Sequence, residues 1–264
     1  MVDIVVCIKQ VPDPQKLDLI KIHPVTKTII REGIPTVMNP VDKNALEEAL
    51  RIKEKYGGKV TVISMGPPQA REVCKEALAM GADEAILLCD RALAGSDTLA
   101  TAYALAKAIM KIGKYDLILC GSETVDGSTG QVPPQLAEFL DIPHVTRARK
   151  IEVANGKVIV ESVIEYGYRL VEAQFPVVIS VTREINTPRI VSAFGLIAAE
   201  KKKLEVWTAS DIEADPNMIG LNGSPTAVVD VFRKEFKRAG IIFKEPLEEA
   251  IKKAIQKLYE LGVI

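Results

Sequence analysis

The 264-residue chain is predicted to be an α/β protein, doubly wound around a mostly parallel sheet, with antiparallel edge hairpins and a C-terminal extension. Two observations predict this class. In the first half, short apolar segments alternate with helix-like segments, and strands that are joined through helices run parallel. Beyond Pro143 the sequence changes to an alternation of apolar and polar residues with a period near two, which is typical of antiparallel strands.

The apolar segments of the first half have the length and bulk of strands buried on both faces. They span residues 3–9, 60–65, 84–89 and 116–120. The segments between and after them place apolar residues at helical spacing, and they span residues 44–56, 70–80, 98–112 and 130–140. We expect Gly57-Gly58 and Gly81 to end the first two helices, and Ser96 or Asp97 to cap the third.

The second half carries hairpin signals. Asn155-Gly156 is the strongest short turn signal in the chain, and a second reversal is expected near Tyr166 to Tyr168. These hairpins should add antiparallel strands to the sheet edge and not form a separate domain. The segment from Ala198 to Val206, which contains Lys201 to Lys203, is predicted to be a helix that ends in cations.

The C-terminal part is predicted to be an arm. After Trp207 comes a connection containing Pro, Gly and Asn, residues 215–226, and then two amphipathic segments, 228–240 and 246–264. We therefore expect an α/β domain over residues 1–206 and an arm with a helix over residues 207–264. From the sequence alone, packing of the arm on a partner chain and packing on its own chain are equally compatible with this pattern.

Composition limits the possible functions. The net charge of −1 provides no basic face for nucleic acid. No apolar run approaches the roughly 20 residues of a membrane span, and the N-terminal residues lack the pattern of a signal peptide. The cysteines, Cys7, Cys74, Cys89 and Cys120, form no CxxC pair and are expected to be buried, reduced thiols, so we expect a cytoplasmic protein without membrane insertion.

Loops after the predicted parallel strands should meet at one edge of the sheet. They begin at Lys9, Gly66, Asp90 and Gly121, and the carboxyl ends of parallel strands are where open α/β sheets bind ligands. None of these loops is a GxGxxG or a GxxxxGK[ST] sequence. A nucleotide site here would therefore be of another kind than the usual dinucleotide or P-loop site.

The fourth loop, YDLILCGSETVDGSTGQVPPQLAEFL over residues 115–140, has the residue types of a phosphate site. Its glycines, Gly121, Gly127 and Gly130, allow the backbone to approach a ligand closely. Ser128 and Thr129 offer hydroxyl groups and a helix N-cap. A helix beginning at about Thr129 would direct free N–H groups at a phosphate. An ordinary loop with a capped helix explains the same residues.

Several longer motifs resemble one known family. They are VVCIKQVPD, KIHPVTKTIIREG, VMNPVDKNALEEALRIKE, VTVISMGPPQA, ALAMGADEAILL, GQVPPQLAEFLDIPHVT, NTPR and AEKKKLEVW. Together they cover most of the chain and resemble the beta subunit of electron transfer flavoprotein. The segment DRALAGSDT, residues 90–98, resembles the bifurcating branch of that family.

This resemblance implies a flavoprotein function in electron transport and a heterodimer with an electron transfer flavoprotein alpha subunit. We expect the C-terminal arm, residues 207–264, to pack on that partner subunit. The bifurcating branch implies FAD in this subunit and NADH as substrate. A hydride would be taken from NADH, with one electron passing to ferredoxin or flavodoxin. The other would pass through the alpha-subunit FAD to a high-potential acceptor, a dehydrogenase or a quinone oxidoreductase. The alternative is a non-bifurcating carrier that binds AMP structurally.

The resemblance also implies the residues of the nucleotide pocket. They are Cys7, Ile8, Lys9, Asn39, Asp42, Ser64, Met65, Gly66, Cys120, Gly121, Asp126, Gly127, Ser128, Thr129, Gly130, Gln131 and Val132, and the bifurcating branch adds Asp97, Thr98 and Thr101. Thr98 and Thr101 would lie one turn apart on one helix face. Asp126 would repel a phosphate, so we expect it to bind a ribose hydroxyl or to order its loop. No catalytic side chain is expected, and His23 and His144 lack the neighbours of a general base.

Two departures from the family pattern are visible. Glu123 stands where the family commonly has Gln, and residues 163–180 lack the usual acid-Gly-Gly run. Two other protein classes share the alternating α/β pattern. An ATP-binding module of the universal-stress type would need a Gly-x-x-Gly run followed by Gly-Ser, and an ATP-pyrophosphatase would need Ser-Gly-Gly-x-Asp-Ser where this chain has KQVPDPQ.

Overall fold

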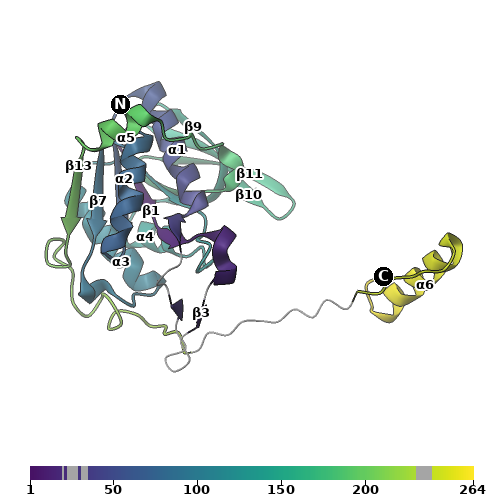
Figure 1. The fold of residues 1–264 in the computed structure, drawn as a ribbon. Coiled ribbons are helices and arrows are strands. Elements are labelled where there is room, and N and C mark those ends of the chain that lie inside the picture. The colour runs from purple at the N-terminus through teal and green to yellow at the C-terminus, as the bar shows by residue number, and fades with distance from the viewer. Residues whose placement is uncertain (20, 23–28, 31–34, 230–239) are drawn as a thin grey trace. The chain divides into compact units, whose positions relative to one another are not determined.

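The computed structural model describes residues 1–19, 21–22, 29–30, 35–229 and 240–264 (Figure 1). These residues form two compact units, one ending at Val229 and the other running from Asp230 to the C-terminus. The first unit contains the main sheet and the helices that cover it. The functional division expected at residue 206 stays a prediction.

Within the described residues the main sheet has nine strands. The two strands at one edge are joined by antiparallel pairing, and the remaining strands pair with one another in parallel. In order across the sheet they are β11 (Gly167–Gln174), β10 (Lys157–Ile164), β9 (His144–Ala154), β12 (Val177–Val181), β8 (Leu117–Gly121), β1 (Ile4–Ile8), β6 (Val60–Met65), β7 (Glu84–Leu88) and β13 (Lys203–Trp207). This confirms the predicted fold class, a mostly parallel sheet with antiparallel strands at one edge.

The helices of the described residues are α1 (Pro40–Tyr56), α2 (Arg71–Met80), α3 (Thr98–Ile112), α4 (Val132–Leu140), α5 (Ala193–Ala199) and α6 (Leu247–Glu260), with short 3-10 turns η1 (Pro14–Leu19), η2 (Pro68–Ala70), η3 (Arg91–Leu93) and η4 (Arg183–Ile185). Two small antiparallel pairs complete the structure: β2 (Gln10–Pro12) with β5 (Thr36–Met38), and β3 (Lys21–Ile22) with β4 (Ile29–Ile30).

Each face of the sheet has its own hydrophobic core. Successive side chains of a strand point to opposite faces, so in β1 Val6 joins the core with α1 and α2 while Val5 joins the core with α3 and α4. Leu46 and Leu136 are fully buried in these two cores. Burial of each such side chain contributes roughly 1.5–3 kcal/mol. Because both faces are covered, the loops at the strand ends are the part of the sheet that can reach a ligand.

The strand order places a topological switch point between β1 and β8. From β1 the chain moves outward through β6 to β7, and it then returns to pair β8 with the other side of β1. The loops after β1 and β8 therefore diverge to opposite faces of the sheet. In open α/β sheets such a point is where the crevice for a ligand forms.

The predicted helix ends are confirmed in most cases. Asp97, and not Ser96, is the N-cap of α3, since its side chain accepts hydrogen bonds from Leu99 and Ala100. Gly57 and Gly81 follow α1 and α2 with φ of 70° and 135°, a region that favours glycine. The helix after β8 begins at Val132, although the sequence predicted a start at about Thr129.

That later start has a physical reason. Pro133 and Pro134 have no N–H group and fit only the first turn of a helix, so they fix the position of that turn. The preceding Gln131 makes no side-chain cap hydrogen bond, and the predicted capping by Ser128 or Thr129 is wrong. Ser128 instead has a positive φ of 47° and bonds back to Thr124.

The hairpin predictions are confirmed. Asn155 and Gly156, with φ of 48° and 79°, form the two-residue turn between β9 and β10. The second reversal lies at residues 165–166, between β10 and β11. The strand β12 differs from the expected antiparallel edge, because it is parallel, fully buried and inserted between β8 and β9. Its uninterrupted apolar composition is the signal for such a strand.

The helix expected over residues 198–206 is wrong. Helix α5 ends at Ala199, and Lys203–Trp207 form strand β13, which pairs in parallel with β7 at the far edge of the sheet. Leu204 packs against one core and Trp207 against the other, as strand periodicity requires. The three lysines made this segment look like a cationic helix end, whereas sheet pairing with β7 decides its conformation.

Two other predictions fall partly outside the described residues. The family motif KIHPVTKTIIREG, residues 21–33, contains the antiparallel pair β3 and β4, while His23 lies outside the described part. Most of the amphipathic segment 228–240 also lies outside it, whereas the segment 246–264 contains α6. His144 is exposed at the start of β9. Within the described residues, none of the helices has the length and apolarity needed to cross a membrane.

Candidate functional site

Asp42 connects the two loops of the switch point. It lies in the first turn of α1 and is buried, with an exposed fraction of 4%. Its Oδ2 accepts a hydrogen bond from the Lys9 N–H at 2.8 Å, in the loop after β1. Its Oδ1 accepts one from the Gly121 N–H at 3.1 Å, at the end of β8. A single carboxylate thus fixes the distance between these loops.

Asn39 extends this connection further into the loop after β8. Its Nδ2 donates to Asp42 Oδ1 at 3.0 Å and to the Glu123 carbonyl at 2.9 Å. Its Oδ1 accepts from the Val125 N–H at 3.2 Å. Since Asn39 is fully buried, these bonds satisfy its amide and hold the loop backbone in place. Glu123 takes part through its carbonyl, so the residue type at this position does not affect the bond.

The close approach at Gly121 requires glycine. A Cβ at this position would lie 2.2 Å from Asp42 Oδ1, which is far inside contact distance. Burial raises the pKa of Asp42 to about 7, against the opposing effect of the hydrogen bonds from Asn39, Lys9 and Gly121. The carboxyl at the centre of the site therefore titrates near neutral pH.

The charged side chains of the predicted pocket pair with each other. Lys9 Nζ lies 2.8 Å from both carboxylate oxygens of Asp126. This ion pair joins the loop after β1 to the loop after β8 a second time, on the more exposed side of the Asp42 connection. In this arrangement Asp126 orders its loop, which was one of its two expected roles.

The loop after β8 has free backbone donors. Within the described part of the chain, the N–H groups of Gly127, Thr129, Gly130, Gln131 and Val132 form no hydrogen bond. Gly130 adopts a left-handed φ of 62°. Consecutive unpaired N–H groups in a turn are a known anion-binding arrangement. Phosphate binding would therefore use the loop itself more than the helix start, since Pro133 and Pro134 cannot donate.

The end of β6 adds a buried hydroxyl group. Ser64 is fully buried beside Ile8 of β1, and its Oγ has no hydrogen-bond partner among the described residues. A buried hydroxyl without a partner costs roughly 1–3 kcal/mol, so a ligand atom that pairs with it is favoured. The loop after β6 lies beside the segment after β1 at this edge of the sheet, because Gln10 Nε2 donates to the Gln69 carbonyl at 3.1 Å.

Cys7 and Cys120 lie side by side on β1 and β8. The hydrogen bond from Cys7, together with burial, holds the pKa of the Cys120 thiol well above its usual value. Burial also raises the pKa of Cys74 to about 12. All the cysteines are free thiols, as expected, although Cys7 and Cys89 are only partly buried. Cys120 therefore contributes a neutral thiol to the site.

In the loop after β7, the side chain of Asp97 bonds to the start of α3 and to Thr226. Asp97 Oδ1 accepts hydrogen bonds from Leu99 and Ala100, and Oδ2 accepts from the N–H and the Oγ1 of Thr226. Burial acts to raise the pKa of Asp97, but these hydrogen bonds hold it below its usual value. Thr98 lies in the first turn of α3, and Thr101 lies one turn later on the same face. The carboxylate of Asp97 is thus fully used within the chain.

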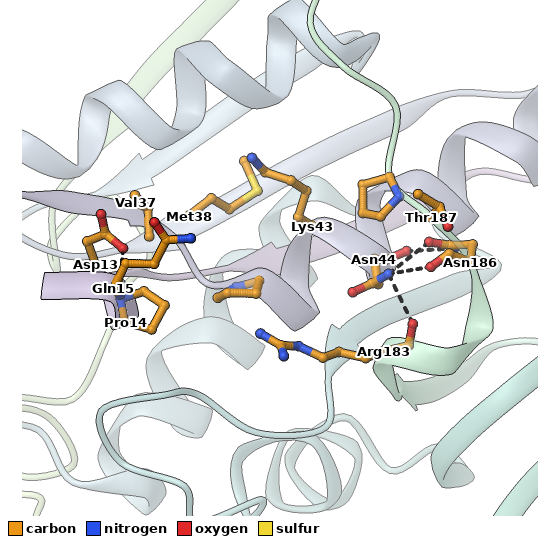
Figure 2. Close-up of a pocket in the computed structure, with 12 residues that line it drawn as sticks. Asp13, Pro14, Gln15, Val37, Met38, Lys43, Asn44, Arg183, Asn186 and Thr187 are labelled. Carbon is orange, nitrogen blue, oxygen red and sulfur yellow. Dashed lines mark hydrogen bonds between the residues drawn. The ribbon is translucent and has the colours of Figure 1, made fainter. Parts of the chain in front are cut away.

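A separate pocket of about 520 Å³ lies beside the start of α1 (Figure 2). On one side Figure 2 shows Asp13, Pro14 and Gln15, and on the other Asn44 faces Asn186. None of the residues predicted for the nucleotide site lines this pocket. Met38 and Pro40 line it, and they flank Asn39, so the pocket and the Asp42 connection adjoin each other.

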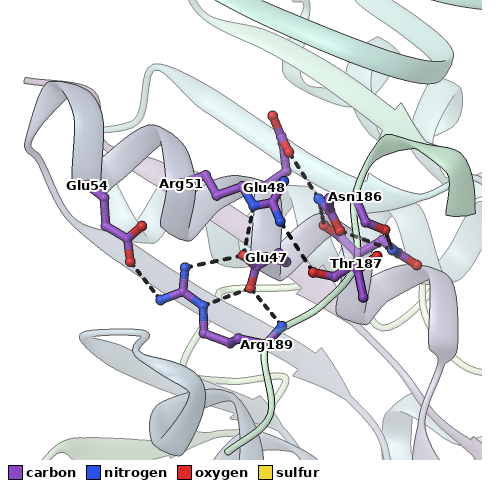
Figure 3. Close-up of polar contacts among 8 residues, drawn as sticks. Glu47, Glu48, Arg51, Glu54, Asn186, Thr187 and Arg189 are labelled. Atoms are coloured by element: carbon purple, nitrogen blue, oxygen red, sulfur yellow. Dashed lines mark hydrogen bonds and ion pairs between the residues drawn. The ribbon is translucent and has the colours of Figure 1, made fainter.

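The NTPR segment, residues 186–189, is fixed to α1 (Figure 3). Arg189 donates to Glu47 at 2.7 Å and to Glu54 at 2.6 Å, and Asn186 donates to Glu48 at 3.0 Å. Sequence reasoning gave this motif no role. The signal was present as two acidic residues two turns apart on one face of a helix and an Arg distant in the sequence, but only the tertiary fold shows that they meet.

The fold and these loops define a class first: a doubly wound α/β protein with unpaired backbone N–H groups, among the described residues, in the loop at its switch point. The family model for the electron transfer flavoprotein domain matches residues 26–212. The chain therefore belongs to the electron transfer flavoprotein family, and its relatives place it with the beta subunits.

The relatives are similar over nearly their whole length. The electron transfer flavoprotein subunit beta of Thermoanaerobacterium thermosaccharolyticum is 53% identical over 263 residues, which cover 99% of this chain and 100% of the relative. Subunit CarD of the caffeyl-CoA reductase-Etf complex of Acetobacterium woodii is 44% identical, with 99% of each chain covered. Protein FixA of Azotobacter vinelandii is 45% identical, with 90% of this chain and 87% of the relative covered.

Proposed function

We propose that this electron transfer flavoprotein beta subunit binds FAD at the β1–β8 switch point and belongs to the bifurcating branch. It would form a heterodimer with an alpha subunit and accept a hydride from NADH. One electron would go to ferredoxin or flavodoxin, and the other through the alpha-subunit FAD to a dehydrogenase or quinone oxidoreductase. The similarity to CarD and FixA and the DRALAGSDT segment support this branch.

The loop after β8 is the observation that carries the proposal. Its N–H groups without a partner among the described residues, those of Gly127 and of Thr129 to Val132, suit the phosphates of a nucleotide. Ser64 provides a buried hydroxyl that lacks a partner within the described residues. Gly121 and Gly66 keep side chains away from the crevice, since a Cβ on Gly121 would collide with Asp42. These features fit a dinucleotide or mononucleotide. The proposed contacts are the residues that the family resemblance implies, except that Asp97 acts through the start of α3.

The protein's own groups would position the ligand and set its electrostatic environment. A bound flavin would supply the hydride and single-electron chemistry. Asp42 and Asn39 hold the two loops at a fixed separation, and the Lys9–Asp126 ion pair restrains them on the exposed side. Because Lys9 is paired with Asp126, its charge is partly neutralised. The loop N–H groups are therefore the main donors that we assign to the phosphates.

A non-bifurcating carrier with AMP in this subunit is the alternative, and one observation favours it. Asp97 belongs to the residues implied to contact the flavin, yet both of its oxygens are already used by Leu99, Ala100 and Thr226. It therefore offers no free acceptor to a flavin. In the proposed site, Thr98 and Thr101 keep the direct contacts, and Asp97 orders the start of α3.

The nucleotide content of the purified complex with the alpha subunit separates these functions. The bifurcating form should release two FAD per heterodimer on denaturation, as identified by chromatography and mass spectrometry. The simple carrier should release one FAD and one AMP. A complex without a nucleotide in this subunit would contradict both. Recovery of ATP would favour an ATP-binding module instead.

Anaerobic addition of NADH tests the hydride route directly. In the bifurcating form, stoichiometric NADH should bleach the flavin absorbance within seconds without any added dehydrogenase. A double variant, Asp97→Ala with Thr98→Ala, should lower the flavin content of this subunit and leave the alpha-subunit flavin in place. A spectrum that NADH leaves unchanged, but that dithionite reduces, would rule out the bifurcating form.

A further inference from the structure

Residues 208–226 form a strap along the start of α3 and the loop before it, and they end near the boundary of the second unit. Ile212 and Ile219 anchor the strap in the core on the α3 and α4 side of the sheet. The Ala209 N–H donates to Asp90 at 3.1 Å, and the Asp215 N–H donates to the Tyr103 hydroxyl at 3.1 Å. The strap therefore belongs to the α/β unit.

The far end of the strap meets the loop after β7. The Gly220 N–H donates to Ser96 Oγ at 3.0 Å, and the Asp97 N–H donates to Ser224 Oγ at 2.8 Å. The backbones approach so closely that a Cβ on Gly220 would lie 2.2 Å from the Ala92 carbonyl oxygen. This loop is the DRALAGSDT segment, so the segment has a role in holding the strap.

Asp97 links the start of α3 to the strap, with one carboxylate oxygen bonded to each. Oδ1 caps α3 through Leu99 and Ala100, at 3.0 and 3.1 Å. Oδ2 accepts from the Thr226 N–H at 3.1 Å and from the Thr226 Oγ1 at 2.8 Å. Four donors occupy the four acceptor sites that a carboxylate offers, so no lone pair remains for a ligand.

We propose that Asp97 is a positioning residue that couples the start of α3 to the end of the strap, and so couples the nucleotide site to the segment that leads into the second unit. Its first oxygen orders the turn that carries Thr98, and its second holds Thr226, close to the end of the first unit at Val229. A change at Thr226 should then alter nucleotide retention, although Thr226 is not a nucleotide contact. This second part rests on the proposed function, whereas the coupling of α3 to the strap does not.

Two conservative variants isolate the strap bond. Asp97→Asn keeps an oxygen that can cap α3, but it places an amide NH₂ opposite the Thr226 N–H. Thr226→Val removes the hydroxyl donor and keeps the side-chain shape. Asp211→Asn is the control, because the Asp211 carboxylate bonds only within the strap, to Thr208.

Hydrogen exchange in the purified complex with the alpha subunit is the first measurement. Both variants should speed the exchange of peptides covering residues 216–229 by about tenfold, which corresponds to the loss of one hydrogen bond of about 1.4 kcal/mol. The α3 amides should stay protected in Asp97→Asn, and the control should match the wild type. Unchanged exchange of residues 216–229 in both variants would overturn the proposed coupling.

The rate of nucleotide release from the same complexes is the second measurement. Faster release from both Asp97→Asn and Thr226→Val would support coupling through the strap. Faster release from Asp97→Asn alone would show a direct contact between Asp97 and the nucleotide and would overturn the positioning role. If the wild-type complex holds no nucleotide in this subunit, the proposed function fails, while the exchange result still decides whether Asp97 holds the strap.

Discussion

Asp42 is the residue on which the geometry of the site depends. Its buried carboxyl receives three hydrogen bonds, two of them from backbone N–H groups in different loops. Removing one partner of a buried polar group leaves the others unsatisfied, at a cost of roughly 1–3 kcal/mol. The site therefore depends on a side chain that need not touch the ligand, and its ionisation should be visible in the stability of the protein.

We expect Asp42 to make stability fall as pH rises. Burial raises its pKa to about 7 in the folded state, above the usual 3.8, so the folded state holds the proton more tightly. The free energy of unfolding that Asp42 contributes through this proton is complete below pH 3.8 and is lost as pH rises through about 7. Its slope is at most about 1.4 kcal/mol per pH unit. Urea unfolding of wild type and Asp42→Asn between about pH 5 and pH 8 should show this difference in slope. Equal slopes would contradict it.

At the scale of elements, the NTPR segment fixes the chain after η4 to α1. Glu47 is buried, and its carboxylate accepts hydrogen bonds from both Arg189 and Arg51. Asn44 and Asn186 add reciprocal amide bonds one turn earlier. The contacts connect residues about 140 positions apart, as in the 142-residue separation of Glu47 and Arg189. They hold the side of the pocket in Figure 2 that contains Asn186.

Arg189→Ala should destabilise the first unit by on the order of 3 kcal/mol, because it leaves a buried carboxylate with one fewer partner. Burial acts to raise the pKa of Glu47, but the hydrogen bonds from Arg189 and Arg51 hold it below 4.5. The stability that the ionised Glu47 contributes is therefore present above pH 4.5 and is lost as pH falls below it. Thermal or urea unfolding near neutral pH should show the deficit, and it should shrink in acid.

The control for this prediction is Arg169→Ala, at an exposed position on the edge strand β11. It removes the same charge and should change stability by less than about 0.5 kcal/mol. If both variants were equally stable, the NTPR contacts would not hold the segment.

At the scale of the whole molecule, the chain forms two units of unequal size. The second unit contains α6, whose residues Leu247, Ile251, Ile255 and Leu258 are spaced along one helix face and exposed. An apolar helix face needs a surface to pack on, and membership of the beta subunits implies an alpha subunit as a partner. Packing of this arm on the alpha subunit remains a proposal.

Ile255→Glu should weaken association with the alpha subunit by roughly tenfold or more, since it places a charge on the apolar face of α6. Gln256→Glu is the matched control, with the same change in charge at the next position, and should associate normally. Copurification and titration of the two chains would measure the effect. Deletion of residues 230–264 should have a larger effect and leave the first unit folded, because that unit has its own cores. Normal association of Ile255→Glu would exclude this face from the interface.

The sequence by itself determined the alternating elements, the hairpin at Asn155-Gly156 and a cap at Ser96 or Asp97, and its longer motifs carried the resemblance to the family. The elements, the turn and the cap depend on local periodicity and local hydrogen bonding, which a short segment carries within itself. The same reasoning failed for β13 and for the insertion of β12. The conformation of both depends on pairing with strands that are distant in the chain.

Only the tertiary structure decided which site residues meet and in what role. It brought Lys9, Asp42 and Gly121 together, paired Lys9 with Asp126, and directed Asp97 to Thr226 instead of leaving it free for a ligand. The physical reason is that a side chain bonds to the groups that lie near it in space, whatever their distance in the sequence. An Asp whose acceptor sites are filled by its own chain cannot accept a hydrogen bond from a ligand, whereas a free Asp can, and the sequence does not distinguish the two.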